Sequence, residues 1–334
     1  MKHDYNKIVY LDDKRKDALW IDWTLGNHCN FSCSYCPDNL HDGSVKWISI
    51  EECEKFVRKI IVHYSQFDKK YFIFNLLGGE PTVWKDLKKF CILVREIAAE
   101  NNVTAIIEIL TNGGRTMRWW RSNYHLFDTF KITHHSEFAD PRHTKELAEF
   151  LYETGNRCSV QVPMLPDNWD VCIRHIKVLA DTDIPYNLLT KTLLIDFGSN
   201  PYPYTDEQKD YIEQAWEGSL EKNIKPSLEL EPIVKTRAYQ MLNDSIIDSV
   251  KPSQILLQRK HSWLGWKCWV GIDMIQIRPD GYMKLGGSCE VKYPGFTQKH
   301  ISDNFEFPTE PVTCTQKWCP CAADILIRKE KIND

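Results

Sequence analysis

The sequence predicts an α/β fold: a partial (β/α)6 TIM barrel followed by a small C-terminal module with a β-hairpin and a helix. First, strand-like apolar runs alternate with amphipathic helical patterns from about residue 18 to residue 196. Second, this alternation is typical of parallel βαβ units, and the chain shows six of them. Third, turn formers and cysteines replace this pattern after residue 196. Six units favour an open partial barrel, although periodicity alone does not separate it from a doubly wound sheet.

The composition excludes several functional classes. A chain of 334 residues, 43% of them hydrophobic, can bury the core of one large domain, or of one domain and a smaller one. Its 42 Lys and Arg residues, against 46 Asp and Glu, form no basic face, so we expect no nucleic-acid partner. No apolar run approaches the roughly 20 residues that span a bilayer. Because the start also lacks the apolar stretch of a secretion signal, we expect a cytoplasmic protein with no membrane partner.

The predicted elements of the barrel follow in a regular order. The first strand is "ALWIDWTL", from Ala18 to Leu25. The first helix starts after Ser49, whose side chain can cap it, and Glu52 three residues later completes a capping box. Further strands are expected at 71–78, 104–111, 129–135, 158–165 and 186–194, and further helices at 84–100, 116–127, 144–154 and 169–181. The carboxyl ends of the strands form the functional side in either architecture.

The segment after residue 196 has a different pattern. The stretch "FGSNPYPYTDEQ" is rich in turn formers and leads into a helix that begins near Thr205. Residues 271–287 predict a hairpin that turns at "PDG". We therefore expect four parts: an N-terminal extension (1–17), the barrel (18–200), a linker and helical region (201–260) and the C-terminal module (261–334).

Twelve cysteines in a reducing compartment indicate metal binding or catalysis rather than disulfides. They form an N-terminal group, a C-terminal group and a scattered set. The first group is Cys29, Cys33 and Cys36; the second is Cys268, Cys289, Cys314, Cys319 and Cys321; the scattered set is Cys53, Cys91, Cys158 and Cys172. The scattered set is expected to include ordinary buried thiols, since free cysteine packs as a small hydrophobe.

The N-terminal group lies in "GNHCNFSCSYCPDN", directly after the first strand. A disulfide needs two sulfurs and a structural zinc usually needs four ligands, and nothing nearby completes that set. Three thiolates on one short loop can hold three irons of a [4Fe–4S] cluster and leave the fourth iron open to a reactant. A zinc loop is the alternative that spacing alone does not exclude.

The spacing C-x3-C-x2-C, with Tyr35 before its last cysteine, resembles the signature of the radical S-adenosylmethionine (SAM) superfamily. A second motif strengthens the resemblance, because "GGEPT" follows the second strand as the corresponding motif does in that superfamily. There the turn contacts the amino group of SAM, which implies this role for Gly78, Gly79, Glu80 and Pro81. Bare glycine backbone allows close approach, and the Glu80 carboxylate can take an ammonium. On its own, GGEPT would be a glycine turn that ends a strand.

Weaker matches follow the later strands. Asn112, in "LTNGG", ends the third strand much as a turn near the cofactor does in relatives. Thr133 and Ser136 follow the fourth strand and are similar to polar residues near the SAM ribose or the substrate. Gln161 on the fifth strand is a candidate for the same surroundings if its side chain points inward. For each of them a simple turn or cap is the alternative.

The resemblance implies a [4Fe–4S] cluster on Cys29, Cys33 and Cys36 that binds SAM at its open iron. One electron, from a donor such as flavodoxin or ferredoxin, would split SAM into methionine and a 5′-deoxyadenosyl radical. That radical would abstract a hydrogen atom from an unactivated C–H bond, while the protein positions the carbon and excludes water. Cys158 and Cys172 are candidate catalytic residues, as hydrogen-atom donors to a product radical.

The C-terminal group resembles the twitch module, the shortened relative of the SPASM module, which carries one auxiliary cluster. In that module one cysteine precedes a hairpin, another follows it, and a close group near the terminus completes the site. Cys268, Cys289 and the group of Cys314, Cys319 and Cys321 fit this layout and imply one auxiliary [4Fe–4S] cluster. The spacing in "CTQKWCPC" departs from the usual C-x2-C, and five thiols exceed what one cubane needs. A structural zinc site or free thiols are the alternatives.

The sequence leaves the substrate open. The first hypothesis is a ribosomally made peptide in which the enzyme forms a crosslink, an oxidation or an epimerised residue, as many twitch and SPASM relatives do. The second is a small polar molecule, such as an aminosugar that is dehydrogenated or rearranged. The third is a non-enzymatic iron–sulfur or zinc protein. About seventeen residues precede the first strand, which is too few for the leader-binding domain of some peptide-modifying relatives. Family base rates nevertheless favour the peptide by a small margin.

Overall fold

Six parallel strands lie side by side in sequence order at the centre of the computed structural model, which describes residues 4–220, 238–289, 291, 299–303 and 306–332. They are β2 (Ala18–Thr24), β3 (Tyr71–Leu77), β4 (Thr104–Thr111), β5 (Thr129–Thr133), β6 (Arg157–Pro163) and β7 (Asn187–Lys191). Each pairs in parallel with the next. The sheet is open, because β7 forms one of its edges. The predicted partial barrel is thereby confirmed.

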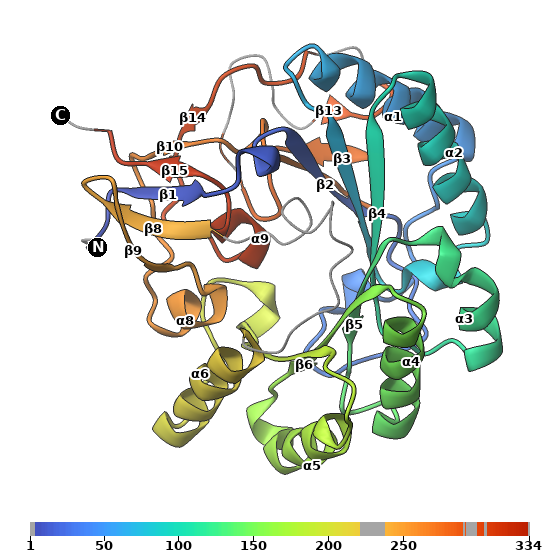
Figure 1. Ribbon diagram of the computed structural model, residues 1–334, viewed down its shortest axis with the longest axis vertical. Helices are drawn as coiled ribbons and strands as arrows, with labels where there is room; N and C mark the ends of the chain where they lie inside the picture. Colours follow the sequence, from blue (N-terminus) through green and yellow to red (C-terminus); the bar gives the residue numbers. More distant parts are fainter. Residues whose placement is uncertain (1–3, 221–237, 290, 292–298, 304–305, 333–334) are drawn as a thin grey trace.

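Helices cover the outer face of these strands (Figure 1). They are α1 (Ile50–Ser65), α2 (Leu87–Glu100), α3 (Met117–Asn123), α4 (Pro141–Glu153), α5 (Trp169–Ala180) and α6 (Asp206–Leu220). Ser49 caps α1 as predicted, because its hydroxyl oxygen accepts from the Glu52 N–H at 3.2 Å. Phe56 and Ile60 of α1 are fully buried, and burying such a side chain stabilises the fold by roughly 1.5–3 kcal/mol. Within the described ranges, every helix is too short or too polar to traverse a lipid bilayer.

The predicted hairpin extends the barrel sheet instead of standing apart from it. Its first strand, β11 (Met274–Ile277), pairs in parallel with β2 and antiparallel with β12 (Tyr282–Lys284). β13 (Lys299–His300) continues the sheet beyond β12. Gly281 makes the turn, with a φ of +79° and its N–H donating to the Arg278 carbonyl oxygen at 3.0 Å. The hairpin therefore completes a nine-stranded sheet.

A second sheet joins the two ends of the chain. Its strands in spatial order are β14 (Val312–Thr313), β10 (Lys267–Cys268), β15 (Lys329–Glu330), β1 (Lys7–Tyr10), β8 (Ala238–Leu242) and β9 (Ser245–Ser249), and the short helices α8 (Pro252–Leu257) and α9 (Ala322–Ile325) belong to the same part of the chain. The expected extension 1–17 and linker 201–260 thus both contribute strands to the C-terminal module. The boundaries expected from sequence do not follow the sheets, because these pairings are long-range. Residues 221–237 of the expected linker lie outside the described residues.

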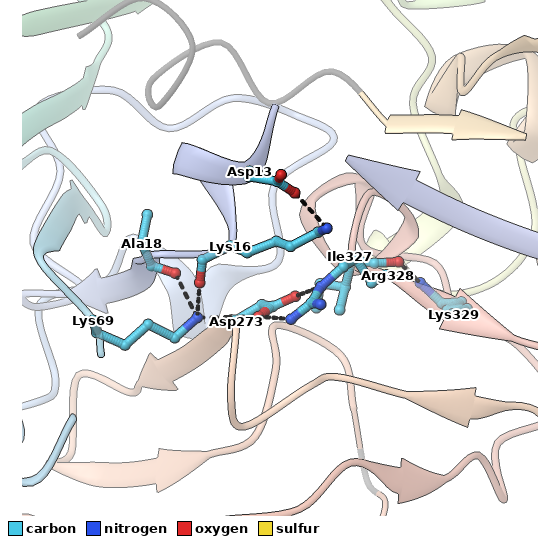
Figure 2. Close-up of polar contacts among 8 residues, drawn as sticks. All are labelled: Asp13, Lys16, Ala18, Lys69, Asp273, Ile327, Arg328 and Lys329. Atoms are coloured by element: carbon cyan, nitrogen blue, oxygen red, sulfur yellow. Dashed lines mark hydrogen bonds and ion pairs between the residues drawn. The ribbon is translucent and has the colours of Figure 1, made fainter. Parts of the chain in front are cut away.

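A buried cluster of charges joins the two sheets (Figure 2). Asp273, just before β11, receives two hydrogen bonds of 2.7 Å from Arg328, which directly precedes β15. Lys69 Nζ, just before β3, lies 3.2 Å from the same carboxylate and donates to the Ala18 carbonyl oxygen at 3.0 Å. Burial acts to raise the pKa of Asp273, but pairing with Arg328 and Lys69 outweighs it, so that pKa lies below its usual value.

Candidate functional site

The cysteine loop begins where β2 ends and lies against the turn that follows β3. The Gly79 N–H donates to the Gly26 carbonyl oxygen at 3.0 Å, and the Glu80 N–H donates to the His28 carbonyl oxygen at 2.7 Å. The GGEPT turn is therefore hydrogen-bonded to the first residues of the loop. Two motifs that are about fifty residues apart in sequence meet at the carboxyl ends of neighbouring parallel strands, where a functional site is expected.

Both glycines of this turn are required by the close approach of the loop. A Cβ atom on Gly79 would lie 2.3 Å from the His28 carbonyl oxygen, and one on Gly78 would lie 2.5 Å from the Gly26 carbonyl oxygen. Gly78 also has a φ of +152°, which other residues rarely adopt. A side chain at either position would push the turn away from the loop.

The Glu80 carboxylate also positions the turn after β4. It is almost fully buried and accepts from the Thr82 N–H at 3.0 Å, the Thr111 hydroxyl at 2.8 Å and the Asn112 N–H at 2.7 Å. Burial raises the pKa of Glu80, and these hydrogen bonds oppose that rise. A carboxylate can accept about four hydrogen bonds, so the contact with an ammonium stays a prediction. Pro81 starts the 3-10 turn that follows.

Asn112 connects this turn to the cysteine loop. Its side-chain amide donates to Asn30 Oδ1 at 2.8 Å and lies 3.9 Å from Cys29 Sγ. Its own Oδ1 accepts from the Gly114 N–H at 2.8 Å. Asn112, which directly follows β4, therefore helps to fix the position of Cys29. The sequence placed "LTNGG" at the end of this strand.

His135, after β5, holds the other half of the loop. Its Nδ1 lies 3.3 Å from Cys33 Sγ and is hydrogen-bonded to the Tyr35 hydroxyl. Beside it, the Ser34 N–H donates to Glu137 Oε2 at 3.0 Å. Burial lowers the pKa of His135 to about 4, so the imidazole is neutral at pH 7. His135 therefore contacts the cysteine loop directly, although no sequence motif marks it.

The three thiols lie on one short loop. Burial raises the pKa of Cys29, of Cys33 to about 12 and of Cys36 to about 11, and a bound metal would favour their thiolate forms. Among the described residues, no three His, Cys, Asp or Glu side chains lie close enough to share one metal ion.

The remaining predicted cofactor residues lie on the same side of the barrel. Thr133 ends β5 and is buried. The Ser136 hydroxyl is buried and has no hydrogen-bond partner among the described residues, so it is available to a polar group of a cofactor. Gln161 lies on β6 between Val160 and Val162, which are buried in the core; strand alternation therefore turns Gln161 to the inner face.

Polar side chains line the inner face of the barrel. The strand register places Gln276, Asp22, Asn75 and Glu108 in one row across β11, β2, β3 and β4. The Asn75 amide donates to Asp22 Oδ1 at 2.6 Å, and the Trp20 indole N–H donates to the same oxygen at 2.5 Å. Barrels filled only by their own side chains carry mostly Val, Ile and Leu at such positions. Asp22, Asn75 and Glu108 are almost fully buried, so the row forms a polar layer in the barrel interior.

These inner residues were not singled out from the sequence. Lys131 Nζ of β5 lies 2.5 Å from Glu108 Oε1 and 4.5 Å from the centroid of the Trp20 ring. Burial raises the pKa of Asp22 to about 6, although hydrogen bonds from Asn75 and Trp20 oppose the rise. The available signal was a charged residue inside each apolar strand run, as in "ALWIDWTL", "TAIIEILT" and "TFKIT".

The C-terminal cysteines converge on one another, with Cys268 on β10, Cys289 after β12, and the other three before α9. Cys268 interacts electrostatically with Cys314. Cys289 interacts with Cys268 and Cys314, and Cys319 interacts with Cys268. Burial raises the pKa of each thiol, and the nearby Lys329 ammonium partly offsets this for Cys268, Cys314 and Cys319. Cys321 interacts electrostatically with Cys319, and also with Asp324 and with Asp22 of the barrel.

The structure places Cys158 and Cys172 away from the inner face. Both are buried in the core between the sheet and its helices, and Cys172 Sγ of α5 lies 3.6 Å from the Pro163 carbonyl oxygen. Cys158 alternates with the inward-facing Ser159 and Gln161 along β6. This placement counts against the hypothesis that either thiol donates a hydrogen atom to a radical inside the barrel.

Comparison with known proteins gives a family match and fold matches. Residues 23–179 match the family model described as the radical SAM superfamily. The fold is similar to solved structures of anSMEcpe with bound AdoMet, at 15% identity, a TM-score of 0.54, and coverage of 86% of this chain and 78% of that one. A structure of anSMEcpe with bound AdoMet and Cp18Cys peptide matches at 14% identity, with a TM-score of 0.55 and the same coverage. No curated protein matches the sequence.

Proposed function

Residues 23–179 form a radical SAM domain, and from this premise we propose that the protein cleaves SAM reductively and abstracts a hydrogen atom from a C–H bond of a ribosomally made peptide. The product is a crosslinked, oxidised or epimerised residue. A [4Fe–4S] cluster with bound SAM supplies the one-electron cleavage that generates a 5′-deoxyadenosyl radical. An electron donor such as flavodoxin or ferredoxin serves as the physiological reductant.

One observation carries the proposal: the three-cysteine loop and the GGEPT turn meet above a polar inner face. The loop is hydrogen-bonded to the turn through Gly79 and Glu80, and Asp22 lies further down the strand that leads into the loop. A radical formed at the loop would thus face polar side chains.

Different residues would hold the cluster and SAM. Cys29, Cys33 and Cys36 would hold three irons of the cluster. The backbone at Gly78 and Gly79 would approach SAM, since no side chain covers it, and the unpartnered Ser136 hydroxyl is available to its polar groups.

Other residues keep this loop in place. Asn112 fixes Cys29, while His135 fixes Cys33 and Tyr35 and presents a neutral imidazole to the sulfur.

The C-terminal cysteines would hold one auxiliary [4Fe–4S] cluster as part of the same proposal. Five thiols converge there, one more than a cubane needs. The module also faces the barrel interior, because Cys321 interacts electrostatically with Asp22. A substrate inside the barrel would therefore lie between the two groups of cysteines.

The peptide substrate is supported by the fold similarity to anSMEcpe, whose structures include complexes with Cp18Cys and Kp18Cys peptides. A small polar molecule such as an aminosugar is the second candidate, and the polar interior at Asp22, Asn75 and Glu108 favours it. Incubation with SAM, reductant and each class of substrate, deuterated at its C–H positions, separates the two. Deuterium in 5′-deoxyadenosine identifies the class that donates the hydrogen atom.

The proposed chemistry itself is tested by anaerobic reconstitution with iron and sulfide, followed by SAM and dithionite. We expect 5′-deoxyadenosine by mass spectrometry from the wild type and none from the Cys29/Cys33/Cys36→Ala triple variant. Cys53→Ala, which removes a buried thiol of α1 outside both groups, is the matched control and should retain cleavage. A fully iron-loaded wild type that leaves SAM intact under strong reduction would overturn the proposal.

A further inference from the structure

We propose that Lys191 binds an anionic group of the substrate, a carboxylate or a phosphate, inside the barrel between the two groups of cysteines. This inference rests on the proposed function, because it names the substrate chemistry of the same site. It adds a binding residue that no sequence motif marks.

Lys191 ends β7 and faces the inside of the barrel. The preceding residue, Thr190, points outward, because its hydroxyl donates to the Ile212 carbonyl oxygen of α6 at 3.2 Å. Successive side chains of a strand point to opposite faces, so Lys191 points inward together with Leu189. The register pairs Leu189 with Gln161, which lies on the same inner face.

Two neighbours place Lys191 between the cysteine groups. It interacts electrostatically with Cys321 of the C-terminal group. It also interacts with His135, whose Nδ1 lies 3.3 Å from Cys33 of the N-terminal group. A molecule that reaches from one cysteine group to the other therefore passes the Lys191 ammonium.

The Lys191 ammonium has no carboxylate partner among the described residues, in contrast to Lys131 and Lys69. Lys131 lies 2.5 Å from Glu108 Oε1, and Lys69 lies 3.2 Å from Asp273 Oδ1. The Lys191 side chain is exposed and therefore open to a ligand, and desolvation by the surrounding protein lowers its pKa. An accessible ammonium without a carboxylate partner can pair with an anionic group of a substrate.

Competitive acetylation tests the inference without turnover. The reconstituted full chain is treated anaerobically with trace acetic anhydride, and modification of each lysine is quantified by mass spectrometry. N-acetylglutamate amide represents a peptide carboxylate, inorganic phosphate represents a phosphorylated small molecule, and N-acetylglutamine amide is the uncharged control. We expect one or both anions to protect Lys191, while the control does not and the exposed Lys267 reacts equally throughout. Better protection by N-acetylglutamate amide would indicate a peptide carboxylate, and better protection by inorganic phosphate would indicate a phosphorylated small molecule.

Variants complete the test. In Lys191→Met, protection is followed at the neighbouring Lys131. The anion concentration needed to protect Lys131 should rise ~10-fold, which corresponds to a loss of about 1.4 kcal/mol of binding free energy. Lys191→Arg should retain most of the effect, and Lys267→Met should behave as wild type. Equal labelling of Lys191 with and without both anions would overturn the inference.

Two further outcomes would also overturn it. If SAM rather than the anions protects Lys191, and Lys191→Met loses SAM binding, the lysine belongs to the cofactor site. If Lys191→Met alters the iron content or the cluster spectrum and the anions have no effect, the Lys191 charge stabilises the Cys321 thiolate and does not bind substrate. A failure of SAM cleavage is a separate result, because protection is measured without cleavage.

Discussion

Arg328 binds Asp273 through two hydrogen bonds of 2.7 Å, from Nε to one carboxylate oxygen and from a terminal guanidinium nitrogen to the other. Asp273 has no exposed surface. Arg328 precedes β15 of the second sheet, and Asp273 precedes β11 of the nine-stranded sheet. This pair therefore fixes the C-terminal module against the barrel. Lys69 shares the same carboxylate (Figure 2).

Asp273→Asn should destabilise the protein by roughly 3–5 kcal/mol, because it leaves Arg328 and Lys69 buried without their counter-ion. Urea unfolding under anaerobic conditions measures the loss. Asp13→Asn removes an exposed carboxylate that pairs with Lys16 at 2.6 Å, also drawn in Figure 2, and should leave the midpoint unchanged. Equal midpoints for the two variants would show that the buried cluster contributes nothing.

Gly79→Ala should lower the iron content of the N-terminal site and abolish SAM binding. The added Cβ would lie 2.3 Å from the His28 carbonyl oxygen, so the turn and the loop would separate. Gly155→Ala is the control, since this residue also has a positive φ, of +82°, but an added Cβ meets nothing within 4 Å. Iron analysis and equilibrium dialysis with labelled SAM compare the two. Normal SAM binding by Gly79→Ala would contradict the assignment of the turn.

The wild type should bind about eight irons after anaerobic reconstitution, four in each of two cubanes. The Cys29/Cys33/Cys36→Ala triple variant should bind about four, because only the C-terminal group remains. Iron and sulfide analysis, together with the absorbance of the reconstituted protein, provides the measurement. A full iron load in the triple variant would rule out a cluster on the loop.

Among the last three cysteines, we expect Cys321 to be the thiol that the auxiliary cluster does not need. Cys319 interacts electrostatically with Cys268, and Cys314 with both Cys268 and Cys289, whereas Cys321 interacts with Cys319, Asp324 and Asp22. Cys321→Ala should therefore retain the auxiliary irons, and Cys319→Ala should lose them. Iron analysis in the background of the triple variant isolates this site, and the reverse result would exchange the two assignments.

Asp22 should make a contribution to stability that falls as the pH rises from 5 to 7. Its pKa is about 6 in the folded state, above that of an unfolded aspartate, so the folded state holds a proton that the unfolded state has released. This contribution is present at low pH and is lost as the pH passes 6, by about 1 kcal/mol between pH 5 and 7. The difference in free energy of unfolding between the wild type and Asp22→Asn should therefore shift by that amount over this range in urea unfolding, whereas the difference for Asp38→Asn, at a fully exposed site, should not. A constant difference for Asp22→Asn would contradict the raised pKa.

The sequence was most informative where the chain determines its structure locally. The strand at Ala18–Thr24, the cap at Ser49 and the hairpin turn at Gly281 formed as predicted, because propensity, capping and turn chemistry act over a few residues. The cysteine loop and GGEPT could be connected because successive parallel strands end at the same edge of a sheet.

The role of Glu80 was less accessible, because its partners Thr111 and Asn112 are about thirty residues away. The same holds for the contact between His135 and Cys33, which are 102 residues apart. Charged residues within apolar runs, such as Glu108, were visible in the sequence, but which of them face one another depends on the strand register.

By itself, the sequence determined the order of strands and helices, the three-thiol loop and the glycine turn, since these features follow from short-range spacing and chemistry. The tertiary structure alone decided that β1 and β8 join the terminal sheet, that Asp273 holds the module against the barrel, and that Lys191 faces the interior between the two cysteine groups. The physical reason is that burial, ion pairing and side-chain direction are properties of segments brought together from distant parts of the chain, and no local pattern contains them.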